Sequence, residues 1–327
     1  MPVQFGVFVP QGWKMDLMEI ADPVEQYEAM TRAAQVVDAL PAYDSIWVYD
    51  HFHPIPVPVQ QTVFESWMIT SALARDTKRV KIGQMVTCNG FRQPSLLAKM
   101  ASTVDVLSHG RLYCGLGAGW YEHEWRAYGY GFSETRERMA AFKEACEIVV
   151  RMWTEEAPTF QGKYYSINAP INMPKGVQKP HPSFWIGGGG EQVTLKLVAK
   201  WANACNISGS PETLRHKFAV LREHCAALGR DYESIIRSTS IEPIVVLKAG
   251  DDPERATEAI RRRSGTSFEN FARQATLGTA EQVAARLQAL IDAGANYVIL
   301  YFPRIAYDQE EVYRFADEVI PLLHSAS

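Results

Sequence analysis

The sequence has few of the features that mark secreted, membrane-spanning or zinc-binding proteins. Only five of its 327 residues are cysteines, and they are widely spaced without a CxxC pair. This pattern is typical of reduced thiols in the cytoplasm rather than of disulfides or a zinc knuckle. No stretch approaches the roughly 18 consecutive apolar residues of a transmembrane helix, and the N-terminus has no basic segment like that of a signal peptide. We therefore expect a cytoplasmic protein.

Excess positive charge is also missing. The chain has 33 Lys and Arg residues against 37 Asp and Glu, which gives a formal net charge of −4. Nucleic acids and anionic membranes are bound chiefly by clustered Lys and Arg, so neither is an expected partner. The one basic run, residues 261–263, falls late in a helical stretch, where a solvated helix end explains it. The partner that we expect is a small-molecule substrate.

What the sequence contains instead is a regular alternation of short apolar runs and longer helical ones. Eight runs rich in β-branched and aromatic residues predict strands, and most are almost continuously apolar, as parallel strands buried on both faces are. They cover residues 4–9, 45–50, 80–87, 112–116, 184–187, 204–208, 241–247 and 297–302. Helices are expected between them. The helix at 134–153 has an apolar stripe that includes Met139, and we interpret this stripe as core.

Several expected helices carry explicit boundary signals. Ser210 and Asp252 each precede a proline, which favours the first helical position after an N-cap. Thr279 and Gln282 have the spacing of a capping box, and Gly294 is expected to close the same helix.

Eight strand–helix pairs predict an α/β fold of the (β/α)8, or TIM-barrel, type, forming a single domain over residues 1–327. A doubly wound sheet would normally carry a nucleotide-binding fingerprint at its first turn, where this chain has Pro10-Gln11-Gly12-Trp13. Two segments exceed the usual loop length, at approximately 154–183, after the fourth helix, and 249–276, after the seventh strand. We expect both to be insertions over the active site.

Polar and glycine-rich sequences follow four of the predicted strands. They lie at residues 49–53, 87–92, 115–124 and 187–190. In a (β/α)8 barrel the active site is formed at the C-terminal ends of the strands, so these four segments are expected to meet there. Such clustering argues against a barrel that only binds a ligand without catalysis.

The four consecutive glycines at 187–190 predict a phosphate site. They end a strand and are expected to lead directly into a helix near Glu191. Glycine allows main-chain N–H groups to approach a phosphate closely, and a helix N-terminus favours negative charge. The alternative is a flexible turn.

The glycines at 115, 117 and 119 are weak evidence for a dinucleotide fold, because the next convincing helix is expected only near Glu134. A loop that lets a flat ring lie against bare backbone, beside Trp120 and Tyr121, explains them better.

His51 and His53 form an HxH pair at a strand end, which is how the ligand set of amidohydrolase-type metal enzymes begins. The ends of the fifth, sixth and eighth strands offer no further His or Asp ligand. We therefore expect no metal, and a metal-dependent hydrolase is only a distant alternative. Asp50 beside His51 fits better a carboxylate that hydrogen-bonds next to an imidazole, which can exchange protons near neutral pH.

These segments together resemble the bacterial luciferase-like monooxygenase superfamily, and within it the coenzyme F420-dependent oxidoreductases. The resemblance covers nearly the whole chain. It rests on residues 45–52, 83–87, 115–121 with Glu124 and Tyr128-Gly129, Trp185-Ile186 with the following glycines, 277–279 and 293–295. It implies a (β/α)8 barrel, usually a homodimer, that binds F420 in the barrel mouth and transfers a hydride between the deazaflavin C5 and a small organic substrate. The alternative that it leaves open is an FMN-dependent monooxygenase, which uses reduced flavin and oxygen; the Asp-His pair favours F420.

The resemblance also implies roles for individual residues. His51 and Glu124 are candidates for moving the proton. The candidates for contact with the cofactor are Asp50, Met85, Val86, Thr87, Asn89, Ala118, Gly119, Trp120, Tyr121, Gly187, Gly188 and Gly189. Met85-Val86 matches a bulge, often with a non-prolyl cis peptide, that supports the ring from behind. In the sugar-phosphate dehydrogenases of this branch a glutamate directly follows the third glycine; here that residue is Trp120, which argues against a sugar-phosphate substrate.

Overall fold

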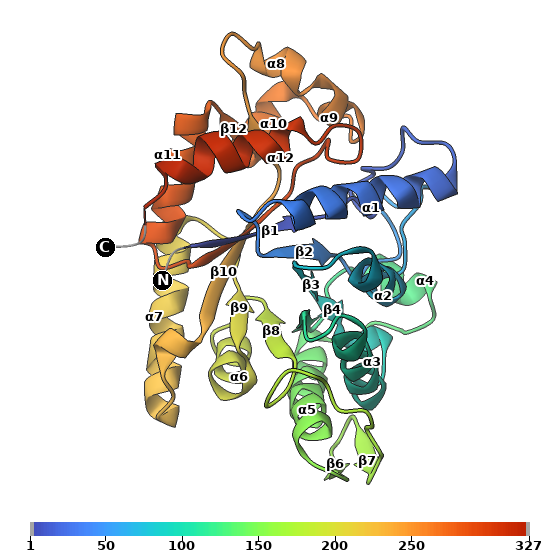
Figure 1. The fold of residues 1–327 in the computed structure, drawn as a ribbon. Coiled ribbons are helices and arrows are strands. Elements are labelled where there is room, and N and C mark those ends of the chain that lie inside the picture. Colours follow the sequence, from blue (N-terminus) through green and yellow to red (C-terminus); the bar gives the residue numbers. More distant parts are fainter. Residues whose placement is uncertain (1–2, 325–327) are drawn as a thin grey trace.

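The computed structural model describes residues 3–324, and its central feature is a closed ring of eight parallel strands (Figure 1). In order round the ring these are β3 (Lys81–Gln84), β2 (Ser45–Val48), β1 (Gln4–Phe8), β13 (Tyr297–Leu300), β10 (Ile236–Ile241), β9 (Ala204–Asn206), β8 (Ser183–Gly187) and β5 (Leu112–Gly117). Pairing of Ile82 in β3 with Leu112 in β5 closes the ring. The predicted (β/α)8 barrel is confirmed.

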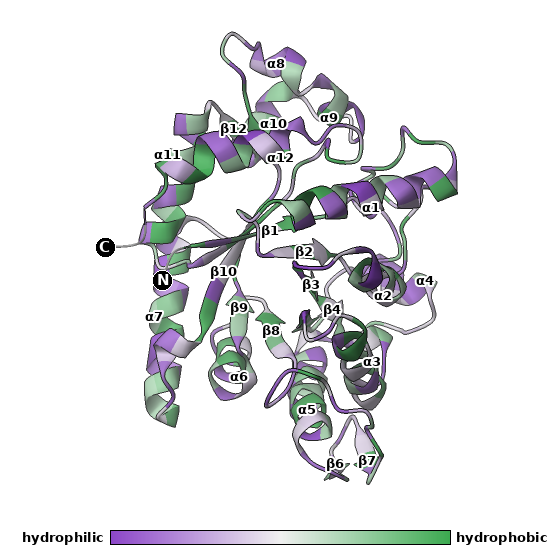
Figure 2. Cartoon of the chain, in the orientation of Figure 1, coloured by the Kyte–Doolittle hydropathy of each residue, from purple (hydrophilic) through white to green (hydrophobic). Residues whose placement is uncertain are grey.

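Two apolar layers hold the barrel together. Val7 and Ile46 belong to the layer between strands and helices, whereas Trp47, Trp185 and Tyr297 meet inside the ring. The ring centroids of Trp47 and Trp185 are 4.7 Å apart. Because both faces of the strands are covered, their sequences are nearly continuous apolar runs. Figure 2 shows helices with both hydrophobic and hydrophilic residues around these strands.

Helices lie around the ring and bury one face each against it (Figure 1). They are α1 (Pro23–Ala39), α2 (Ser66–Asp76), α3 (Pro94–Leu107), α5 (Thr135–Thr154), α6 (Thr194–Trp201), α7 (Pro211–Leu228), α11 (Ala280–Asp292) and α12 (Glu310–Arg314). The capping signals are confirmed: Ser210 caps α7, Asp252 caps α8 (Pro253–Ala256), and Thr279 with Gln282 forms the capping box of α11. Gly294, with φ +108°, follows that helix.

The predicted seventh strand, residues 241–247, is wrong. The barrel strand at this place is β10, which pairs with β9 and β13. The apolar residues farther on form β11 (Ile244–Val246), which pairs with β12 (Thr276–Gly278) outside the ring. Strand β10 has a polar sequence that includes Ser238 and Ser240. These serines fit inside the barrel because their hydroxyls accept hydrogen bonds from Asn206 of the neighbouring strand. Apolar content therefore indicated the wrong segment.

Three other features of the secondary structure differ from expectation. The third strand is interrupted at Met85-Val86, whose peptide bond is cis, and resumes as β4 (Thr87–Cys88). A helix that was not expected, α4 (Glu122–Ala127), follows soon after Gly119; the burial of Glu124 and Trp125 holds this short helix, which local propensity alone would not stabilise. Helix α6 begins at Thr194 and not near Glu191.

The two long segments have secondary structure of their own. Between α5 and β8, strands β6 (Thr159–Gln161) and β7 (Ser166–Asn168) form a hairpin. Between β11 and β12 lie α8, α9 (Glu258–Arg262) and α10 (Phe268–Gln274). Figure 1 places the hairpin and α8–α10 on opposite sides of the barrel.

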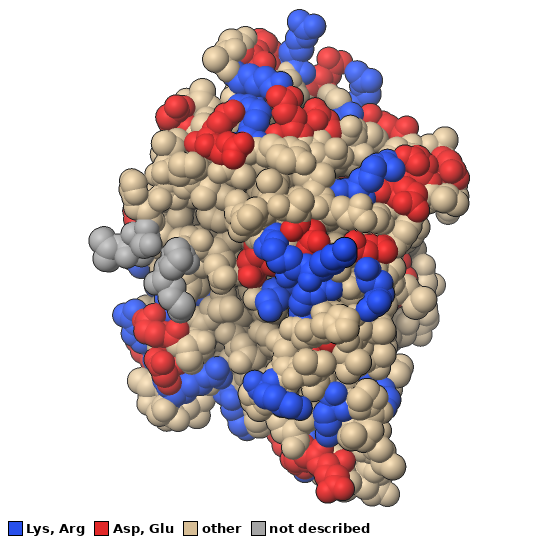
Figure 3. Space-filling model, in the orientation of Figure 1, with Lys and Arg blue, Asp and Glu red and all other residues tan. Residues whose placement is uncertain are grey.

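Charged side chains of both signs are interspersed in small groups on the face shown in Figure 3. No helix within residues 3–324 combines the length and the apolar character needed to cross a membrane.

Candidate active site

A cavity of about 450 Å³ opens at the C-terminal ends of the barrel strands. Residues that follow β1, β2, β3, β5, β8, β9 and β10 contribute to its wall, so segments far apart in the sequence meet where the sequence predicted an active site. Of the predicted site residues, eleven line it: Asp50, His51, Met85, Val86, Ala118, Gly119, Trp120, Tyr121, Glu124, Gly187 and Gly188. We expected two insertions over the active site, at 154–183 and 249–276. Within the described chain, neither segment contributes a residue to the cavity wall.

Three of the predicted residues lie away from the wall. The hydroxyl of Thr87 accepts a hydrogen bond from the indole N–H of Trp67 at 3.2 Å. The side-chain amide of Asn89 donates to the hydroxyl of Tyr165 at 3.1 Å. Gly189 lies directly beyond Gly188 along the loop.

His51 is held in one orientation by contacts with residues from other elements. Its Nδ1 lies 2.8 Å from Oε2 of Glu124. Its ring stacks on Trp13 with a centroid distance of 4.2 Å and an interplanar angle of 2°. The edges of Trp120 and Tyr121 approach it from other directions. Because an ionised carboxylate only accepts hydrogen bonds, this contact places the proton on Nδ1 and leaves Nε2 as the ring nitrogen able to accept another proton.

Glu124 is completely buried, and both of its carboxylate oxygens are occupied. Oε1 accepts the main-chain N–H groups of Phe52 and His53 at 2.7 and 2.8 Å, and Oε2 contacts His51. One carboxylate on α4 thus fixes both the backbone after β2 and the imidazole that follows it. The arrangement suits a residue that positions His51 rather than one that itself exchanges a proton with a substrate.

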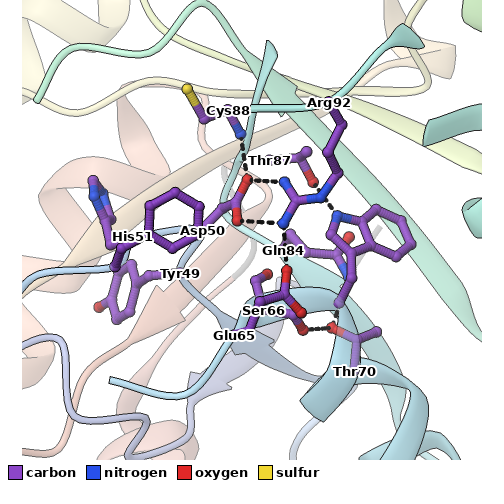
Figure 4. Close-up of polar contacts among 12 residues, drawn as sticks. Tyr49, Asp50, His51, Glu65, Ser66, Thr70, Gln84, Thr87, Cys88 and Arg92 are labelled. Atoms are coloured by element: carbon purple, nitrogen blue, oxygen red, sulfur yellow. Dashed lines mark hydrogen bonds and ion pairs between the residues drawn. The ribbon is translucent and has the colours of Figure 1, made fainter. Parts of the chain in front are cut away.

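Asp50 belongs to an ion-pair network behind the cavity (Figure 4). Its two oxygens accept hydrogen bonds from the guanidinium of Arg92 at 2.6 and 3.0 Å, and one also accepts the N–H of Cys88 at 2.8 Å. Arg92 in turn contacts Glu65, the N-cap of α2. The network joins the ends of β2 and β4 to the start of α2, so the wall of the cavity is braced by three elements.

Cys88 lines the cavity as well, but its thiol is not prepared for nucleophilic attack. Burial, followed by the nearby charge of Asp50, raises the pKa of Cys88 well above its usual range. The side chain is therefore a neutral, poorly nucleophilic group in the wall.

Val86 projects against strands β5 and β8, where glycines leave room for it. A Cβ added at Gly117 would lie 2.5 Å from Val86, and one at Gly187 would lie 2.9 Å away. A Cβ at Gly115 would lie 1.8 Å from the carbonyl oxygen of Gln84. Gly115 and Gly117 are strand residues, and their lack of a side chain lets the interrupted third strand pass close by. This close strand contact, and not a loop against a flat ring, is what the structure shows for the first two glycines of the run.

The tetraglycine segment forms an open loop between β8 and α6. Gly188, with φ +115°, adopts a conformation that favours glycine, and its N–H donates to the carbonyl of Asn206 at 2.9 Å. Within residues 3–324, the N–H groups of Gly189 and Gly190 find no main-chain or side-chain acceptor. The side chain of Thr194, at the start of α6, lines the cavity next to them. Two free N–H groups and a hydroxyl form a suitable anion cradle.

Glu191 turns away from this loop. Its carboxylate binds Nζ of Lys217 at 2.5 Å and Nε2 of His216 at 3.0 Å, both on α7. It therefore places no negative charge against the cradle, as a phosphate site requires.

The two histidines of the HxH pair do not converge on a common point. His51 faces Glu124, whereas the ring of His53 lies 5.0 Å from that of His123. No group of three His, Cys, Asp or Glu side chains able to hold a metal ion was found in the part of the chain that the structure describes.

Sequence reasoning missed several residues of the wall. Trp13 follows β1, and Ser240 and Glu242 lie at the end of β10, which was assigned to the wrong segment. Met139 packs against the core as expected, but it is only half buried and also lines the cavity from α5. The position of Trp13 just after a strand was a usable signal, whereas that of Met139 was not.

Comparison with known proteins places these features in a family. Residues 3–269 match the family model described as luciferase-like monooxygenase. The F420-dependent glucose-6-phosphate dehydrogenase of Amycolatopsis mediterranei (strain U-32) is 27% identical, and the match covers 93% of this chain and 95% of that protein. The FMNH(2)-dependent dimethylsulfone monooxygenase of Pseudomonas putida is 28% identical, covering 79% and 78%. The structure of an F420-dependent secondary alcohol dehydrogenase in complex with an F420–acetone adduct superposes with a TM-score of 0.80 at 21% identity, over 99% of this chain and 100% of that one, which shows a common fold.

Proposed function

The chain is an enzyme of the luciferase-like monooxygenase family that depends on F420 or a flavin, and we propose that it is an F420-dependent oxidoreductase. In this proposal a hydride passes between C5 of the deazaflavin and a small organic substrate. The observation that carries it is the cavity itself, in which a histidine held by a carboxylate shares the wall with Gly188 and Thr194, on either side of the two glycines with free N–H groups.

The residues present fit a flat ring system with a phosphate-bearing tail. Val86, supported by the glycines of β5 and β8, offers an apolar surface for the ring. The N–H groups of Gly189 and Gly190 and the hydroxyl of Thr194 would hold the phosphate. The same set would serve F420 or FMN, because both carry a phosphate near a tricyclic ring.

When bound, either cofactor supplies the capacity to accept or release a hydride. The chain supplies the rest. His51 would exchange a proton at Nε2 with the substrate, and Glu124 would keep the imidazole in the tautomer that allows it. The aromatic side chains around His51 would keep bulk water away from the reacting carbon.

Two considerations support F420 over FMN. Relatives that are named as F420-dependent glucose-6-phosphate dehydrogenases match most of the chain at 27–29% identity. The Asp50-His51 pair is the sequence feature that resembles the F420 branch. The FMN alternative, a monooxygenase that uses reduced flavin and oxygen, is supported by the similarly distant dimethylsulfone monooxygenase.

The test is to titrate the purified protein separately with F420 and with FMN and to follow absorbance and fluorescence. We expect F420 to bind at least about tenfold more tightly than FMN. Tighter binding of FMN would favour the FMN-dependent alternative over F420. Binding of neither cofactor would refute both proposals.

The same titration with phosphate-free forms of each ring system examines the anion cradle without any mutation. Loss of the phosphate should lower affinity at least about tenfold, because charge-assisted hydrogen bonds to main-chain N–H groups would be removed. Equal affinity would show that the protein does not hold the phosphate.

A further inference from the structure

The space around His51 is bounded by aromatic side chains. Trp13 stacks on its ring, and Trp120 and Tyr121 approach from other directions. Trp120 is 61% exposed and stacks against Tyr121 with a centroid distance of 5.2 Å, so a large apolar pair stands at the cavity rim. Exposed aromatic side chains beside a cavity are typical of sites that take up apolar molecules.

No lysine or arginine lines the cavity within the part of the chain that the structure describes. Its charged wall residues are the acidic Asp50, Glu124 and Glu242, apart from any protonated histidine. Asp50 forms an ion pair with Arg92 behind the wall, and the carboxylate of Glu124 accepts hydrogen bonds from His51 and two main-chain N–H groups. A substrate phosphate or carboxylate would therefore lose its hydration without gaining a cationic side chain in return.

The ammonium group of Lys14 lies beside the cavity but is already engaged. It forms an ion pair with Glu242, and the two side chains are only 18% and 21% exposed. It also lies over the rings of Trp13 and Tyr301, at 5.2 and 4.9 Å from their centroids. Glu242 and the aromatic faces together compensate this positive charge, which could otherwise attract an anion.

From this geometry we infer that the enzyme acts on an uncharged alcohol or carbonyl compound with an apolar or aromatic body, and that Glu242 excludes anionic substrates by holding Lys14. The inference rests on the proposed function. In the oxidative direction the substrate carbon would lose a hydride to oxidised F420 and its hydroxyl proton to His51, and a carbonyl compound would result. A cationic substrate is not favoured, because each of the three carboxylates already has its own partner.

The decisive comparison uses two compounds of the same shape that differ by one charge, acetophenone and 4-acetylbenzoate. Their binding is followed by quenching of protein tryptophan fluorescence, with the protein alone and with the protein saturated with whichever cofactor it binds. We expect acetophenone to bind at least about tenfold more tightly. Equal or tighter binding of the carboxylate, or binding of neither compound, would overturn the inference.

Turnover separates this inference from the proposed function. With reduced F420 we expect reduction of acetophenone, and with oxidised F420 we expect no reaction with glucose 6-phosphate. Oxidation of glucose 6-phosphate would leave the proposed F420 dependence intact and refute only the inference that the substrate is uncharged. Failure of F420 to bind would refute the proposed cofactor, while the fluorescence comparison would still decide the charge preference.

A substitution at Glu242 tests its proposed role directly. Glu242→Gln should release Lys14 and tighten binding of 4-acetylbenzoate about tenfold relative to acetophenone. Lys14→Met in the same background should restore the original preference. Glu258→Gln, which removes an exposed ion pair with Arg262 outside the cavity wall, is the matched control. An unchanged preference in Glu242→Gln would contradict the proposed exclusion.

Discussion

His51 is the residue on which the proposed chemistry depends most. Its partner Glu124 is 73 positions away in the sequence, and the stacked Trp13 comes from the loop after β1. A side chain that is held by a buried carboxylate on one edge and an indole on one face has little freedom to reorient. This fixed orientation is what general acid–base catalysis requires of the group that moves the proton.

We predict that His51→Ala lowers kcat by about 100-fold or more, while the Kd of the cofactor changes less than about threefold. The reason is that the imidazole would act on the substrate proton and not on the phosphate-bearing tail. Steady-state kinetics and a cofactor titration measure the two effects. His53→Ala is the control, since the His53 ring lies beside His123 and outside the cavity wall. Parallel losses of turnover and cofactor affinity would refute the proton-transfer role.

Arg92 is expected to contribute to stability through Asp50. Because the Asp50 side chain is fully buried, Arg92→Met would leave its charge without its main partner and should destabilise the protein by about 3–5 kcal/mol. Adding Asp50→Asn should recover a large part of the loss, since the buried charge is then gone. Urea unfolding of both single variants and the double variant measures the coupling. Additive effects of the two substitutions would show that the ion pair is not the cause.

Helix α12 is joined to strand β11 by the carboxyl group of a half-buried glutamate. Oε1 of Glu311 accepts the N–H of Val246 at 2.6 Å, and Arg314 from the same helix donates to the carbonyl of Val246 at 2.9 Å. Burial raises the pKa of Glu311 from 4.5 to about 7, although the hydrogen bond and Arg314 act in the opposite direction. This helix–strand contact should therefore respond to pH.

The direction of that response follows from the two pKa values. Between about pH 4.5 and 7 the folded protein keeps the Glu311 proton that the unfolded chain has lost, so stability falls as the pH rises through this range and is level above it. The total loss is about 3 kcal/mol. We predict that urea unfolding shows a decline of about this size between pH 4.5 and 8 in the unaltered protein relative to Glu311→Gln, which does not titrate. The control is Glu310→Gln, at an exposed neighbouring position, which should keep the decline in stability. If Glu311→Gln showed the same decline as the unaltered protein, the pH dependence would belong to other groups.

For the molecule as a whole, we propose that residues 1–327 form one domain and that two chains form a homodimer. The described strands join a single closed ring apart from the two small sheets. Met68 and Leu96, on the adjacent helices α2 and α3, are 73% and 53% exposed, which is typical of a surface that a second chain covers.

Sedimentation of the purified protein should give twice the mass of one chain. Replacing both Met68 and Leu96 with Lys should shift the protein to single chains, because burial of two charges would oppose association. Val24→Lys, at an exposed apolar position on α1, is the control. A monomeric unaltered protein would refute the dimer, and a dimer that survives both substitutions would place the interface on another surface.

The sequence by itself determined what depends on neighbouring residues. Apolar runs of strand length placed seven of the eight barrel strands, and the capping signals at Ser210, Asp252 and Thr279 marked where helices begin. These features could be predicted because each is set within a few residues of chain.

Only the tertiary structure decided which side chains meet. Closure of the barrel pairs Asp50 with Arg92, 42 positions away, and brings Lys14 into an ion pair with Glu242. Glu242 follows β10, a strand that contains serines and therefore could not be found as an apolar run. Likewise, Gly115 and Gly117 are strand residues that make room for the neighbouring strand, and they do not form the loop expected from the sequence. Hydrophobic periodicity reports whether a residue is buried, but the identity of its partner depends on how distant segments are brought together by the closed ring.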